Sequence, residues 1–326
     1  MGLAGVRDYF FPINPVTERR EIHLIPSSLE KYVGENSYAP LISKSGGEVT
    51  SLHSNEKYAG YARLVKDVGA KLATQAKRKD LEFEFKVIDS QENNAWCLPG
   101  GKIGINVGLI EKMDTEEVLD ESLRRFSLEE KIAAVLSHEI VHADARHTGR
   151  ALEFRLFLIG IIKATQIFFV YRLVTRSYDE KIAEARKTAQ QSFNPNDETR
   201  NKDALSQVRN LTLERNAKAK TYGYLFDALS SWLINGITLC SSRSHELESD
   251  RFGMRMIRDV SKAEVPGFID TSPQAAIWLQ LFFEKHHEHA SSYFNSIKNF
   301  FSTHPSPEVR LAANRKTWED LQAERL

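Results

Sequence analysis

The chain has 326 residues, of which 41% are hydrophobic and 27% are charged. These proportions are typical of a globular protein with a sizeable core, and they exclude a disordered or collagen-like chain. Lysine and arginine together number 44, and so do aspartate and glutamate. This balance leaves no basic surplus for a phosphate backbone, so we expect no nucleic-acid partner.

The start of the chain shows no secretory signal, because no apolar run follows a charged segment. Gly2 is present, but Val6 stands where a myristoylation signal needs serine or threonine. As written, the chain is expected to be cytoplasmic or membrane-associated; with a removed leader, it would be periplasmic or mitochondrial. Cys97 and Cys240 lie far apart in sequence and are expected to be buried free thiols.

Local patterns predict an α+β fold that is mainly helical. Apolar side chains recur at helical spacing between residues 54 and 77, which predicts an amphipathic helix. Residues 81–88 alternate between apolar and charged side chains, as a half-buried strand does. Residues 95–98 and 102–107 flank a Pro-Gly-Gly turn and predict two short strands. Residues 1–50 show no clear period, and we interpret them as an N-terminal extension.

The most informative motif is HEIVH. Ser127 and Glu130 form a capping-box pattern ahead of it, which predicts that the motif lies on a helix. Residues four apart share a helix face, so the imidazoles of His138 and His142 can bind one metal ion. Glu139 then stands beside the metal's water without being a ligand, and it can act as a general base. This is the pattern of zinc peptidases, in which zinc lowers the pKa of that water to about 7.

A third ligand is needed, because a catalytic zinc ion has three protein ligands and an open position. The best candidate is Glu246, which shares a helix face with Asp250 four residues later. Asp250 could then orient a ligand histidine through a hydrogen bond. His245 and Glu248 are the alternatives; His245 points about a quarter-turn away from Glu246, so only one of those two can face the metal.

A long antiparallel helical hairpin is predicted between residues 150 and 240. The strong helix breaker in this stretch is SFNPND, so the tip is expected near Pro195. Residues 156–174 and 224–240 are apolar, but Lys163 and other polar residues interrupt the first segment, which approaches the length of a membrane span. We interpret these segments as buried or interfacial helices, with a membrane-inserted hairpin as the alternative. If the protein meets a membrane surface, they are expected to contact it.

The motifs together resemble the HtpX-like and CAAX-prenyl-protease family of gluzincin metallopeptidases, in particular its mitochondrial quality-control and periplasmic chaperone-protease branch. The likeness runs from an Asn-Ala…Gly-Gly segment at 94–101, through HEIVHADARH and SRSHELESD, to a His-Pro…Arg element at 304–310. It therefore covers most of the chain. The departures are the longer, more charged segment 114–126, Ser249 in place of the usual alanine, and the long hairpin.

This resemblance implies a zincin-like metallopeptidase domain over residues 51–326, with the hairpin inserted at about 150–240. Carried over by position, it assigns one Zn2+ per chain and a catalytic machinery to residues named above: His138, His142 and Glu246 as ligands, Glu139 as the base, and Asp250 as the group that orients a ligand. It also implies that an extended substrate lies beside one exposed strand edge, formed by Gly100, Gly101, Lys102, Ile103, Gly104, Ile105 and Asn106.

Two residues of the last element have less definite roles. His304 either approaches the zinc ion or the transition-state oxyanion, as a catalytic group, or it caps the helix that follows. Arg310 is expected to be an ion-pair partner. A helix is predicted to begin at Pro307, because proline fits the first helical position.

The expected function is hydrolysis of internal peptide bonds in unfolded or membrane-associated proteins, in the manner of protein quality control. A non-proteolytic chaperone or assembly scaffold that uses the same zinc fold is the alternative. A membrane-bound prenyl-protein protease would need several clean transmembrane segments, and the sequence offers at most two doubtful ones.

Overall fold

The computed structural model describes residues 3–116, 120, 123–263, 265–267, 271–288 and 307–324. For residues 3–6, 152, 155, 173, 204, 229–242, 287–288 and 307, it describes the backbone alone. The chain divides into two compact units. We call them the sheet unit, which comprises Met1–Glu153 and Leu239–Leu326, and the hairpin unit, which comprises Phe154–Thr238.

A sheet of four short strands organises the sheet unit, in the spatial order β1-β2-β4-β3. β1 pairs antiparallel with β2, β2 pairs parallel with β4, and β4 pairs antiparallel with β3. Gly100 and Gly101 form the turn between β3 and β4 with φ of 81° and 84°, a region that glycine adopts without strain. The strands are β1 Glu48–Val49, β2 Glu84–Ile88, β3 Ala95–Leu98 and β4 Lys102–Asn106.

The strand order corrects one prediction made from sequence. Lys102–Asn106 is not an exposed edge, because β4 pairs with a neighbour on each side. Ile103 and Ile105 are completely buried, as is usual for an interior strand that is covered on both faces. A substrate therefore cannot pair with β4, and β3 forms the edge of the sheet on that side.

The sheet and the helices that pack against it share one hydrophobic core. Helix α3 (Glu56–Ala73) packs against β2 and α5 (Leu128–Asp144), and α5 packs against α9 (Ala275–Glu288). The side chain of Asn55 caps α3 by accepting from two backbone N–H groups of its first turn. The predicted helix between residues 54 and 77 is therefore confirmed, and its apolar face contributes to the core together with Ile103, Leu109, Ile132, Leu136, Trp278 and Phe282.

The first fifty residues contain more helix than the sequence pattern indicates. Helices α1 (Leu3–Phe10) and α2 (Ser27–Lys44) form there, and α2 contacts β3 and β4. The buried positions of α2 are four residues apart, but they are Glu30, Gly34, Tyr38 and Ile42. This stripe mixes charged, small and apolar residues, so a search for apolar periodicity misses it.

Two further helices of the sheet unit are α4 (Val107–Thr115) and α11 (Pro307–Ala323). Helix α4 follows β4 directly, and α11 packs against α9. The predicted start of the last helix at Pro307 is confirmed. His304 lies outside the described residues.

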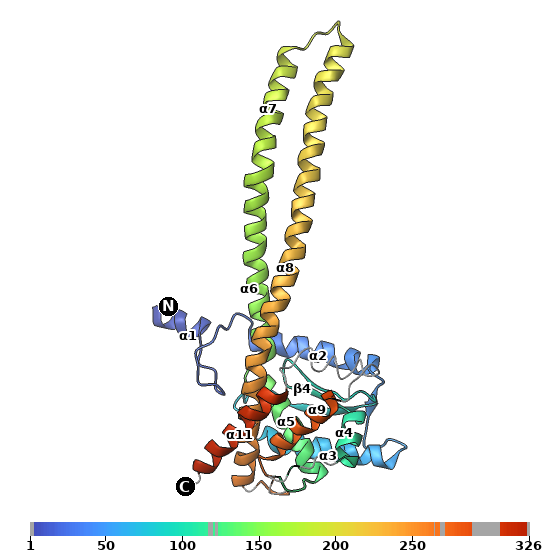
Figure 1. Ribbon diagram of the computed structural model, residues 1–326, viewed down its shortest axis with the longest axis vertical. Coiled ribbons are helices and arrows are strands. Elements are labelled where there is room, and N and C mark those ends of the chain that lie inside the picture. The colour runs from blue at the N-terminus through green and yellow to red at the C-terminus, as the bar shows by residue number, and fades with distance from the viewer. Residues whose placement is uncertain are drawn as a thin grey trace. The chain divides into compact units, whose positions relative to one another are not determined.

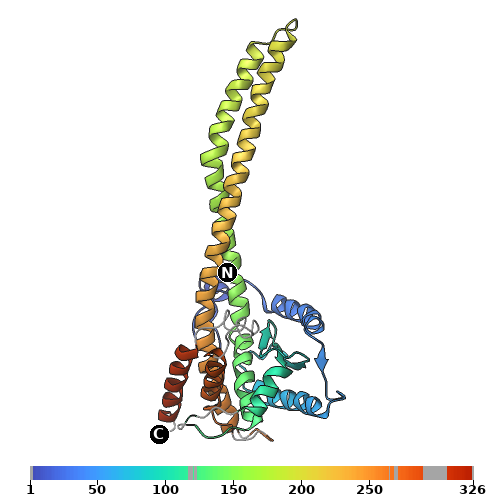
Figure 2. The same cartoon turned by 45° about the vertical axis from the view of Figure 1, so that its right-hand side comes forward.

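The predicted helical hairpin forms. Its elements are α6 (His147–Val170), a π-helical turn (Tyr171–Thr175), α7 (Arg176–Gln191) and α8 (Glu198–Lys262). Figures 1 and 2 both show α7 and α8 side by side, with the tip at residues 192–197 as expected. None of the described helices combines the length and the apolar character that a membrane span requires.

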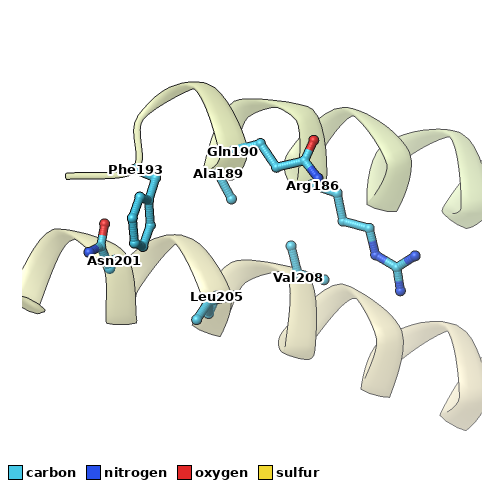
Figure 3. A pocket seen from close by; sticks show the side chains of 7 residues that line it. All are labelled: Arg186, Ala189, Gln190, Phe193, Asn201, Leu205 and Val208. Atoms are coloured by element: carbon cyan, nitrogen blue, oxygen red, sulfur yellow. The ribbon is translucent and has the colours of Figure 1, made fainter. Parts of the chain in front are cut away.

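A thin apolar contact holds the outer arms of the hairpin together. Val174, Tyr178 and Ile182 are buried, and they pack against Val208, Leu211 and Ala219 on the other arm. Nearer the tip, a groove of about 540 Å³ opens between the arms (Figure 3). The lining residues are a mixture of apolar and polar ones: Arg186, Ala189, Gln190, Phe193, Asn201, Leu205 and Val208. They include no carboxylate or histidine, so the groove offers no pair of catalytic groups.

Candidate metal centre

The helix that carries the HEIVH motif has a well-defined start. The Ser127 hydroxyl accepts from the backbone N–H of Glu130 at 3.3 Å, and the Glu130 carboxylate accepts from the backbone N–H of Ser127 at 2.9 Å. This is the predicted capping box. It sets where α5 begins, and the spacing of four residues places His138 and His142 on one face of that helix.

The structure brings three of the predicted site residues together. His138 Nε2 lies 3.1 Å from His142 Nε2. Each carboxylate oxygen of Glu246, on α8, lies 3.2 Å from one of these two nitrogens. In a tetrahedral zinc site with bonds of about 2.0–2.1 Å, neighbouring ligand atoms are about 3.3–3.4 Å apart. The three side chains therefore fit three corners of such a site.

The charges around these side chains also suit a cation. Burial by itself lowers the pKa of His138, but the carboxylates of Glu246 and Asp250 outweigh it and raise the pKa to about 10. The same carboxylates that favour a proton on His138 also favour a metal cation beside it. Among the described residues, His138, His142 and Glu246 form the group of side chains suited to hold a metal ion.

A glycine on α8 permits the close approach of the two ligand-bearing helices. A Cβ atom on Gly253 would lie 3.2 Å from the backbone nitrogen of His138 and 3.2 Å from Ser137 Oγ. Such contacts are tight enough that the neighbours would have to move. Glycine at this position thus lets α8 bring Glu246 and Asp250 up to His138.

Asp250 contacts the second ring nitrogen of His138, the one that does not face His142 and Glu246. Its Oδ1 is 2.9 Å from His138 Nδ1, which leaves His138 Nε2 to face the other ligands. Arg310 donates to both oxygens of Asp250, at 2.7 and 2.6 Å. Burial raises the pKa of Asp250, but the Arg310 guanidinium more than offsets this, so the pKa is lowered and the carboxylate stays charged.

The two alternatives for the third ligand make other contacts. The ring of His245 stacks on that of His147, with centroids 4.5 Å apart and planes 4° from parallel. Glu248 accepts from His147 and from Arg150. Of the three candidates, Glu246 is therefore the one whose side chain contacts both His138 and His142.

Glu139 lies beside the edge strand of the sheet. Its side chain is 6% exposed, and β3 packs against α5. The pKa of the Cys97 thiol on β3 is raised, mainly by burial and secondly by the nearby Glu139 carboxylate. The N–H of Asn106 donates to the carbonyl of Asn94, and hydrogen-bonded pairs alternate along antiparallel strands. The backbone groups of Ala95 and Cys97 therefore point away from β4, toward the edge.

The remaining predicted site residues do not join this group. Gly100 and Gly101 form the β3–β4 turn, and Lys102–Asn106 is the interior strand β4. His304 cannot be placed, because it lies outside the described residues. His286 lies outside the metal pattern, and its Nε2 is 2.9 Å from a carboxylate oxygen of Glu116.

Sequence reasoning missed a buried ionic network at the end of the motif helix. Arg78 donates to Glu30 at 2.8 Å, and Arg146 donates to the same carboxylate at 2.8 Å. Asp144, at the end of α5, accepts from the backbone N–H groups of Lys77 and Arg78. The network joins α2, the end of α3 and the end of α5. The one signal in the sequence is an acidic residue inside a helix that lacks apolar periodicity.

The model of peptidase family M48 matches residues 61–317, which is most of the chain. The chain belongs to peptidase family M48. This confirms the resemblance drawn from the motifs, and the mainly helical fold with a small sheet agrees with it.

Curated relatives of this M48 chain are peptidases by name. It is 28% identical over 156 residues to the mitochondrial metalloendopeptidase OMA1 of Schizosaccharomyces pombe, covering 47% of this chain and 41% of that protein. It is 28% identical over 91 residues to the beta-barrel assembly-enhancing protease of Escherichia coli, covering 28% and 16%. These matches support a metal-dependent peptidase, and each spans less than half of the relative's length.

Proposed function

We propose that this chain is a zinc-dependent metalloendopeptidase, with His138, His142 and Glu246 as the ligands and Glu139 as the general base. The observation that carries the proposal is the mutual 3.1–3.2 Å spacing of the three ligand side chains. Two imidazoles and one carboxylate are a donor set that zinc prefers in peptidases. Membership of an M48 peptidase family supports the same activity.

The side chains have separate tasks in this mechanism. Glu139 takes a proton from the attacking water on a carboxylate oxygen and delivers it to the leaving amine. Zinc, when bound, supplies a Lewis acid that lowers the pKa of the water to about 7 and polarises the scissile carbonyl. Asp250 keeps a proton on Nδ1 of His138, so that Nε2 presents a lone pair to the metal. Arg310 keeps Asp250 charged.

An extended substrate would bind along β3. The outward backbone groups of Ala95 and Cys97 can pair with a peptide, and β3 packs against the helix that carries Glu139. Pairing through the backbone recognises an extended chain without demanding one sequence. Internal bonds of unfolded or membrane-associated proteins are therefore the proposed substrates, in keeping with a role in protein quality control.

The variant Glu139→Gln tests the mechanism. It should retain about one zinc ion per chain and lose hydrolysis of casein by about 10²–10⁴-fold, because the base is removed while the ligands remain. In parallel, Glu246→Ala should lose zinc. Zinc content is measured by elemental analysis and activity by release of labelled peptides. Full activity of Glu139→Gln would rule out this base; a wild type that binds zinc but cleaves no unfolded protein would favour the scaffold alternative.

A membrane surface is the second partner that we propose, through residues 156–174 and 224–240. The support is a set of large apolar side chains that are exposed on α6 and α8, such as Ile167 at 70%, Phe168 at 63% and Tyr224 at 63%.

Flotation with vesicles of phosphatidylcholine and phosphatidylglycerol tests this contact. Ile167→Ser with Phe168→Ser should weaken binding by about tenfold or more, because each lost apolar side chain removes about 1.5–3 kcal/mol. Phe193→Ser is the matched control, since Phe193 is 65% exposed but lies at the tip. Equal binding of all three proteins, or none by the wild type, would contradict the proposal.

A further inference from the structure

The second metal ligand has a partner that the motif does not predict. His147 is the first residue of α6 and is 2% exposed. Its Nδ1 lies 3.2 Å from Nδ1 of His142, and its Nε2 lies 3.1 Å from Oε2 of Glu248. Arg146 before it has φ of 58°, so the chain turns sharply between α5 and α6. The turn returns His147 to the side of His142 that faces away from the metal ligands.

These distances fit one arrangement of the protons on the two rings. His142 presents Nε2 to the other ligands, so in its neutral form the proton is on Nδ1. That N–H needs an acceptor, and Nδ1 of His147 is in position. His147 can accept there when its own proton is on Nε2, and Glu248 accepts that proton in turn. The result is a continuous chain from a carboxylate through two imidazoles to the metal position.

Surrounding contacts hold this chain in place. His147 stacks on His245 with the rings almost parallel, which restricts rotation of its imidazole. The Glu248 carboxylate also accepts a hydrogen bond from the Arg150 guanidinium at 3.0 Å and forms an ion pair with that of Arg19 at 3.5 Å. Both ends of His147 are thus held, and the two arginines hold the Glu248 carboxylate beside Nε2.

We propose that His147, held by Glu248, is a positioning residue that sets the tautomer and ring orientation of the metal ligand His142. The inference rests on the proposed zinc function. Asp250 does the same for His138 by direct contact, whereas Glu248 acts on His142 through a second imidazole. The two ligands are therefore oriented by carboxylates at different distances from the metal.

A pair of substitutions separates hydrogen bonding from packing. His147→Phe keeps a ring to stack on His245 but has no acceptor for His142, and it should weaken zinc binding by about 10–100-fold. His147→Asn loses the stacking but places an amide oxygen near the former Nδ1, and it should recover most of the affinity. Zinc affinity is measured by competition with a chromophoric chelator.

Two further variants keep the test decisive if His147→Phe does not fold. Glu248→Gln should weaken zinc binding severalfold, because a neutral amide holds Nε2 less firmly. The Ser249 hydroxyl also lies 3.1 Å from His147 Nδ1 and could be its true partner. Ser249→Ala should therefore leave zinc affinity within about threefold of the wild type if His142 is the donor.

Cobalt replacement gives a readout that does not depend on turnover. The visible spectrum of the Co2+-loaded protein should change in His147→Phe and resemble the wild type in Ser249→Ala, because it reports ligand geometry. Wild-type zinc affinity in both His147→Phe and Glu248→Gln would overturn this inference alone. Loss of affinity in Ser249→Ala equal to that in His147→Phe would also overturn it. A wild type that binds no zinc would overturn the proposed function, and this inference with it.

Discussion

The two units of this chain differ in whether their described ion pairs include buried ones. In the sheet unit, charges such as Asp250 and Arg310 are buried and matched by partners at hydrogen-bonding distance. In the hairpin unit, ion pairs such as Lys163 with Asp227 are about half exposed, and large apolar side chains such as Phe168 face solvent. The sheet unit thus contains buried, matched charges, whereas the described ion pairs of the hairpin unit are largely exposed to solvent.

This difference has an energetic consequence. A buried charge that loses its partner keeps its desolvation penalty, so removing one member of such a pair is costly. An exposed pair is screened and flexible, and its removal costs little. Stability of the sheet unit should therefore depend on single ionic contacts, whereas stability of the hairpin unit should depend on helix formation and the apolar contact between its arms.

The largest effect is expected where the buried pair next to the proposed metal ligands is broken. Arg310→Met leaves the Asp250 carboxylate buried without its guanidinium and should reduce the free energy of unfolding by about 3–5 kcal/mol. Arg215→Met, which removes the partner of Asp179 in the hairpin unit, should cost less than about 1 kcal/mol. Urea unfolding of the metal-free proteins measures both. Equal losses would show that the two units do not differ in this respect.

A smaller, pH-dependent effect is expected at the cap of the motif helix. Burial raises the pKa of Glu130, but Arg124 and Ser127 outweigh it and hold the pKa below its ordinary value of 4.5. A carboxyl group with a lowered pKa stabilises the fold above its ordinary value, and this is lost as pH falls through the folded pKa. Glu130→Gln should therefore cost about 1–2 kcal/mol near neutral pH, with the difference shrinking in acid.

Unfolding free energies at about pH 7 and about pH 3 measure this effect. The matched control is Glu198→Gln, an exposed first-turn carboxylate at the start of α8. It should change stability by less than about 0.5 kcal/mol at either pH. A constant loss for Glu130→Gln across this range would contradict the assignment of its stabilising role to the charged form.

The smallest effect is expected in the hairpin unit itself. Lys163→Met removes the ion pair with Asp227, whose two side chains are 53% and 50% exposed. The change should be within about 0.5 kcal/mol, because solvent screens the pair. Thermal melting followed by circular dichroism measures it. A loss above about 1 kcal/mol would mean that the hairpin relies on specific ionic contacts as the sheet unit does.

Much of the local structure could be predicted from residue patterns. The capping box at Ser127, the helix over residues 56–73 and the hairpin tip all depend on neighbours within a few positions. Short-range propensities decide such features. The same holds for His138 and His142, whose spacing on a helix follows from the helix alone.

Features that depend on distant partners were harder to predict. Helix α2 was missed because its buried face includes Glu30, which is stable there only through Arg78 and Arg146. The resemblance placed the substrate edge on β4, and the sequence pattern could not correct this, because a hairpin of two strands does not reveal which one will pair with β2. Neither partner is near in sequence.

By itself, the sequence determined the HEIVH motif, the position of the proposed base Glu139 within it and the helical character of most of the chain, because these follow from residue type and periodicity. Only the tertiary structure decided that Glu246, and not His245 or Glu248, faces both motif histidines. It also decided that β3 is the edge beside Glu139. The physical reason is that a helix rotation and a strand order depend on packing between segments far apart in the chain, which no local pattern records.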